Sequence, residues 1–137
     1  MHMKVLYITD FYYTVSSGAK TSARAHFETL RKLYGNENVD LIALVGRSMP
    51  RYAEKNHVII TNVHNNVVLL FNCLCGYSTY IDRSAIHRIT NIIQERKPDA
   101  VFVDNSIFGK LIEQIKKKNP EIPVLCYYHD VKAKLAR

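Results

Sequence analysis

Short apolar runs alternate along this chain with stretches in which apolar residues recur every three or four positions. The runs 4–9, 39–44 and 100–104 have the length and composition of buried strands. Parallel neighbouring strands must be joined by crossovers, which are usually helical and right-handed. The alternation therefore predicts an α/β fold with a doubly wound, mostly parallel sheet.

Three stretches carry an apolar stripe at helical spacing. The first covers residues 19–34 and ends at Gly35, which can adopt the left-handed conformation that stops a helix. The second begins near Thr79 or Asp82 and ends before Pro98. The third ends at Asn119, and its stripe consists of Ile107, Phe108, Leu111, Ile112 and Ile115. Helices between the strands would cover both faces of the sheet in a Rossmann-like three-layer sandwich.

Three further runs have the composition of strands. Residues 57–60 and 67–71 are separated by turn formers, and the residues leave open whether both join the main sheet. The run 122–128 is the last strand candidate, so we expect about five or six strands. We expect residues 1–137 to form one domain that is half of a larger protein, and a complete small domain is the alternative.

The formal net charge of +7 favours acidic partners such as nucleotides, phosphorylated substrates and anionic lipids. Nucleic acid is disfavoured because the chain has no aromatic RNA-binding signature, zinc finger or heptad repeat. The net charge and the mixed apolar and aromatic segment 73–80 also suggest peripheral contact with an anionic membrane.

The cysteines and the apolar runs indicate the cellular setting. Three cysteines without an export segment predict a reducing, cytoplasmic location, extending to the inner face of the membrane if the peripheral contact forms. No apolar run approaches the ~18 residues that cross a bilayer. The histidines and cysteines lack the spacing of metal ligands, so we expect no metal site.

The first candidate site is the segment Ser17, Gly18, Ala19 and Lys20, at the start of the first predicted helix. Backbone N–H groups and the helix dipole can hold a phosphate there, and Gly18 allows a close approach. A plain helix start explains the glycine equally well. The three-glycine dinucleotide pattern and the P-loop lysine are both absent, which disfavours dehydrogenases and P-loop NTPases.

Two more candidate sites follow predicted strands. Asp104 and Asn105 end one strand, and His129 and Asp130 end the last. Ligands of open α/β sheets bind outside the carboxyl ends of the strands, so these side chains are candidates to line a crevice. Capping of the next helix is the alternative for Asp104 or Asn105. The His129 imidazole could hydrogen-bond a hydroxyl or a phosphate oxygen, and it is the candidate catalytic group.

Three segments together resemble the N-terminal domain of a GT-B glycosyltransferase of family 4. They are residues 3–10 with Ser17-Gly18-Ala19, then 97–104, then 122–130. The resemblance implies transfer of a sugar from a nucleotide-sugar donor to a saccharide or lipid-linked acceptor, without a metal or other cofactor, in cell-surface polysaccharide synthesis. It also implies that this domain shapes the acceptor side of the cleft.

Position by position, Gly18 resembles the family's loop glycine, whose backbone approaches the donor phosphates. His129 resembles the histidine near the transferred sugar, whereas Ser17 stands where the family has the first of two glycines. The donor-binding domain with its paired glutamates is absent, so the resemblance implies that this chain alone binds the donor poorly and transfers nothing. A stand-alone flavodoxin-like module that binds a nucleotide or flavin remains the alternative.

Overall fold

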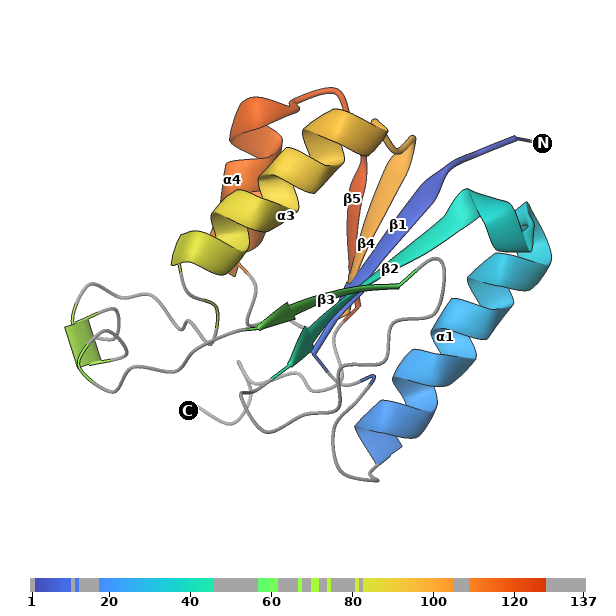
Figure 1. Cartoon of the computed structure of the whole chain (residues 1–137), viewed down its shortest axis with the longest axis horizontal. Helices are drawn as coiled ribbons and strands as arrows, with labels where there is room; N and C mark the ends of the chain where they lie inside the picture. Colours follow the sequence, from blue (N-terminus) through green and yellow to red (C-terminus); the bar gives the residue numbers. More distant parts are fainter. Residues whose placement is uncertain are drawn as a thin grey trace, which may run out of the picture.

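The computed structural model shows a parallel β-sheet with helices on both faces (Figure 1). It describes residues 2–10, 12, 18–45, 57–61, 67, 70–71, 74, 81, 83–104 and 109–127. The α/β class and the Rossmann-like three-layer arrangement predicted from the sequence are confirmed.

The sheet has five strands in the order β3-β2-β1-β4-β5, and every neighbouring pair is parallel. This is the order of the Rossmann fold, whereas flavodoxin-like sheets have the order 2-1-3-4-5. The strands are β1 (Val5–Thr9), β2 (Val39–Val45), β3 (His57–Thr61), β4 (Ala100–Asp104) and β5 (Val124–Tyr127).

The helices cover the two faces unequally. α1 (Gly18–Tyr34) packs on one face, and α3 (Arg83–Arg96) and α4 (Gly109–Lys118) pack on the other (Figure 1). Successive strand residues face opposite sides, so Tyr7 joins the core under α1 while Ile8 joins the core under α3 and α4. No helix in the described part of the chain has the length and hydropathy needed to cross a membrane.

Gly35 ends α1 as predicted. Its φ angle is 95°, and its N–H donates a 2.9 Å hydrogen bond to the Arg31 carbonyl. A Cβ at this position would lie 3.2 Å from Asn38 Nδ2. The short 3-10 helix η1 (Asn36–Asn38) then leads into β2.

The strand predicted at residues 67–71 is wrong. Val67, Leu70 and Phe71 are helical, and each is exposed by 64–74%. A short, wholly apolar run fits a buried strand or a helix equally well. Leu74, also helical, completes a spacing of three, four and seven residues from Val67, which is the periodicity of a helix face.

Candidate functional site

The sheet has a topological switch point between β1 and β4. β1 leads to α1 on one face, and β4 leads to α4 on the other. Chains that leave adjacent strands in opposite directions open a crevice at the carboxyl edge, where open α/β sheets bind their ligands. Thr9 and Asp104, the last residues of the two strands, are register partners at this edge.

A buried polar cluster lies directly beneath the switch point. The Tyr7 hydroxyl donates a 2.5 Å hydrogen bond to Asp104 Oδ2, and the Thr9 hydroxyl donates a 3.4 Å bond to the same oxygen. All three side chains are at most 1% exposed. Residues 7 and 9 point to the same face of β1, which lets both hydroxyls reach the carboxylate on β4. Two donors from the neighbouring strand offset part of the cost of burying this carboxylate.

The pKa of Tyr7 is raised far above its ordinary value. Burial of the phenol is the largest cause, and the hydrogen bond to Asp104 and the charge of Asp104 add to it. The hydrogen bond with Thr9 acts in the opposite direction. Tyr7 therefore remains a neutral donor at physiological pH, and its hydroxyl ties the ends of β1 and β4 together.

An aromatic cluster supports this arrangement from α1. The Phe27 ring stacks on Tyr7 with centroids 6.1 Å apart, and it contacts Tyr12 and His57 edge-on at 5.8 and 5.4 Å. The Arg24 guanidinium lies 4.9 Å from the centre of the Tyr12 ring and also donates hydrogen bonds to the Tyr12 carbonyl. These contacts attach Tyr12 to α1.

Gly18 is the first residue of α1, and Ala19 and Lys20 belong to its first turn. Figure 1 shows that α1 begins at the edge of the sheet where β1 ends. The backbone of Gly18 and the carboxylate of Asp104 thus belong to the same edge of the sheet. Asp104 is fully buried, so its contact with a ligand stays a prediction.

The remaining predicted site residues, Ser17, Asn105, His129 and Asp130, lie outside the described residues. Tyr127, the last described residue of β5, places its ring 4.4 Å from the ring of His26. The carboxyl end of β5 is therefore in contact with α1.

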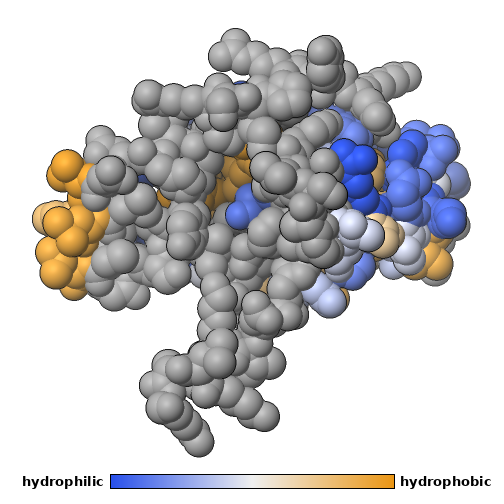
Figure 2. All heavy atoms as spheres, turned by 90° about the horizontal axis from the view of Figure 1, so that it is seen from below, coloured by the Kyte–Doolittle hydropathy of each residue, from blue (hydrophilic) through white to orange (hydrophobic). Residues whose placement is uncertain are grey.

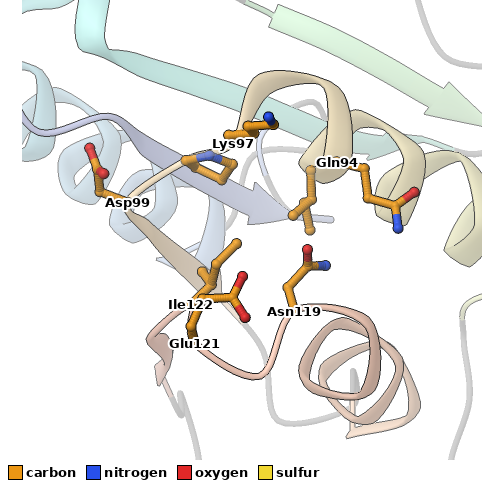
Figure 3. Close-up of a pocket in the computed structure, with 8 residues that line it drawn as sticks. Gln94, Lys97, Asp99, Asn119, Glu121 and Ile122 are labelled. Carbon is orange, nitrogen blue, oxygen red and sulfur yellow. The ribbon is translucent and has the colours of Figure 1, made fainter.

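A hollow of about 460 Å³ lies at the opposite edge of the sheet (Figure 3). It is formed where α3 and α4 end and the chain enters β4 and β5. Its polar lining includes Gln94, Lys97, Asp99, Asn119 and Glu121. Within the described residues, Asn119 Nδ2 is buried without a hydrogen-bond partner. We place the candidate site at the carboxyl edge instead, because ligands of open α/β sheets bind outside the carboxyl ends of the strands.

The sequence interpretation did not include Tyr7 in the site. The sequence feature that could have identified Tyr7 is its phenol in a predicted buried strand. A buried tyrosine hydroxyl usually finds a hydrogen-bond acceptor. Asp104 is the acidic residue that ends another buried strand, which made it the natural candidate acceptor.

The comparisons with known proteins add no relative: no protein-family model matches the sequence, and no match is found among curated proteins. Among the described residues, no three His, Cys, Asp or Glu side chains are grouped as a metal site would need. A helix start beside a switch-point crevice suits an anionic, phosphate-bearing ligand.

Proposed function

We propose that this chain is the acceptor-side domain of a glycosyltransferase, which transfers a sugar from a nucleotide-sugar donor to a saccharide or lipid-linked acceptor. One observation carries the proposal. The three segments that resemble the GT-B family contain β1, β4 and β5, which are consecutive neighbours in the sheet. Segments far apart in the sequence therefore end side by side at the carboxyl edge, as a shared site requires.

The residues have distinct roles in this proposal. Backbone N–H groups at Gly18, with Ser17, Ala19 and Lys20 around them, bind the donor phosphates through the α1 N-terminus. The same groups stabilise the negative charge that develops on the departing nucleoside diphosphate. The net charge of +7 supports an anionic donor by electrostatic steering.

The acceptor side is formed at the ends of β4 and β5. His129 contacts the transferred sugar, and Asn105 and Asp130 contribute polar groups beside it. Asp104 acts as a positioning residue, because its bonds to Tyr7 and Thr9 hold the ends of β1 and β4 in register. Donor-side groups are needed to complete a preorganised site, so we expect this chain alone to transfer nothing.

Turnover of nucleotide sugars tests the proposal. The longest natural reading frame that contains this sequence is incubated with a panel of nucleotide sugars, and release of the nucleoside diphosphate is measured. We expect turnover with at least one donor, a loss of about 100-fold or more for His129→Ala, and little change for the matched control His87→Ala on the surface of α3. Absence of turnover with every donor, or equal rates for the two variants, would contradict the proposed role.

A further inference from the structure

A cluster of large apolar side chains is exposed at one end of the molecule. Val67, Leu70, Phe71 and Leu74 are 74%, 64%, 68% and 78% exposed. All four are helical, and their spacing puts them on one face, which we name the apolar face. Figure 2 shows it as an orange patch at the edge of the molecule. Clustered exposed apolar side chains of this kind mark an interaction surface.

Basic side chains line a groove of about 270 Å³ between α3 and α4. They are Arg83, His87, Lys110 and Lys118, and no acidic residue is among the described residues that line this groove. Arg83 and Lys110 stand in the first turns of α3 and α4, at the carboxyl edge of the sheet. β3 ends at the same edge, six residues before Val67 in the sequence. In Figure 1, α3 begins at the end of the molecule where the apolar face lies.

We propose that the apolar face inserts into the surface of an anionic phospholipid bilayer, and that Arg83 and Lys110 are attracted to the lipid headgroup phosphates. Stable binding to a membrane surface needs two signals. The exposed apolar side chains supply one, and the cations in the first turns of α3 and α4 supply the other.

The net charge of the chain favours an anionic bilayer over a second copy of the chain as the partner of the apolar face. Two copies of a chain with net charge +7 repel each other, whereas an anionic bilayer attracts each copy. The side chains also project from a helix at the edge of the molecule, which suits a planar surface. This inference stands on the apolar face and the basic groove alone, independently of the proposed sugar transfer.

The chain has no tryptophan, so a single introduced indole reports insertion directly. Leu70→Trp is the probe, and Leu33→Trp is its matched control, because Leu33 is 69% exposed on α1 outside the apolar face. With equimolar phosphatidylcholine and phosphatidylglycerol vesicles, we expect the Leu70→Trp emission to shift to shorter wavelength and to be quenched by brominated lipid. The Leu33→Trp emission should stay unchanged. An unchanged Leu70→Trp spectrum would overturn the proposal.

Co-sedimentation with the same vesicles measures the two signals separately. The double variant Leu70→Ser/Phe71→Ser should weaken binding by about tenfold or more, while Leu33→Ser should bind like the wild type. Arg83→Gln should weaken binding by about fivefold, the effect of one cation near an anionic surface.

Three results would overturn the proposal. The first is equal binding to pure phosphatidylcholine vesicles, and the second is wild-type binding by the double variant. The third is a dimer in sedimentation analysis that the double variant abolishes, because that result assigns the apolar face to a second copy. Urea unfolding of each variant verifies that the fold is retained, as expected for substitutions at exposed positions.

Discussion

Tyr7 and Asp104, 97 residues apart in the sequence, are joined by a 2.5 Å hydrogen bond between the Tyr7 hydroxyl and Asp104 Oδ2. The bond crosses from β1 to β4 at the switch point of the sheet, and Thr9 donates to the same oxygen. It therefore fixes the relative position of the two strand ends that border the candidate crevice. Stability and ligand binding at this edge should both depend on it.

Removing the Tyr7 hydroxyl should destabilise the domain. Tyr7→Phe leaves a buried carboxylate oxygen without its shortest hydrogen bond, and we expect the free energy of unfolding to fall by about 1–3 kcal/mol. Tyr34→Phe removes the same atom from a half-buried ring and should change stability by at most about 0.5 kcal/mol. Urea unfolding of the two variants measures both values, and equal stabilities would show that the buried bond contributes nothing.

The raised pKa of Tyr7 predicts a loss of stability in alkali. In the unfolded chain this phenol ionises at its ordinary pKa of 10.0, whereas in the folded protein it keeps its proton to much higher pH. The unfolded state therefore binds fewer protons above about pH 10, and the free energy of unfolding falls there by up to about 1.4 kcal/mol per pH unit.

Comparison with Tyr7→Phe isolates the contribution of this one phenol, because the variant lacks the Tyr7 hydroxyl. The stability difference between wild type and Tyr7→Phe should be constant below about pH 9 and should shrink as the pH rises above 10. Unfolding curves at a series of pH values provide this difference. A difference that stays constant to pH 11 would mean that Tyr7 ionises equally easily in both states.

Gly35→Ala should destabilise the turn that ends α1. Its φ of 95° strains an L-residue, and the new Cβ would lie 3.2 Å from Asn38 Nδ2. We expect a loss of about 1–3 kcal/mol. The matched control is Gly109→Ala at the start of α4, where a Cβ meets no atom within 4 Å and should be neutral or slightly stabilising. Thermal unfolding of the two variants measures this difference in stability. Equal stabilities would mean that residue 35 can relax to a negative φ.

The contact between Phe27 and Tyr12 should be visible as an energetic coupling. A double-mutant cycle with Phe27→Leu and Tyr12→Leu removes each ring separately and together. Edge-to-face aromatic pairs contribute about 0.5–1.5 kcal/mol beyond their buried area, and we expect a coupling in this range. Additive losses of stability would mean that Tyr12 is not anchored to α1 through this ring.

Local patterns were sufficient to predict most of the fold. The apolar runs at 4–9, 39–44 and 100–104 are β1, β2 and β4 within a residue, and the positive φ of Gly35 is confirmed. The run 67–71 was misassigned because a wholly apolar pentapeptide has no periodicity to distinguish strand from helix. Its exposure could not be predicted either, because burial depends on what the rest of the chain packs against it.

The candidate site was only partly predictable. Strand ends and a helix start placed Gly18 and Asp104 at one edge, because parallel strands share their carboxyl edge. The bond between Tyr7 and Asp104 depends on the exact register of β1 and β4, which no local pattern encodes across 97 residues. The predicted roles of Ser17, Asn105, His129 and Asp130 stay predictions.

The proposal that Gly18 and the carboxyl ends of β4 and β5 border one shared crevice is tested most directly by NMR. Amide signals of the labelled chain are followed during titration with a panel of nucleotide sugars, at concentrations high enough to detect weak binding, because this chain alone is expected to bind the donor poorly. We expect the shifts to concentrate at Gly18, Asp104 and Tyr127, with Asp99 and Glu121 at the opposite edge unchanged. Shifts confined to the Asp99 and Glu121 edge, or none with any nucleotide sugar, would contradict it.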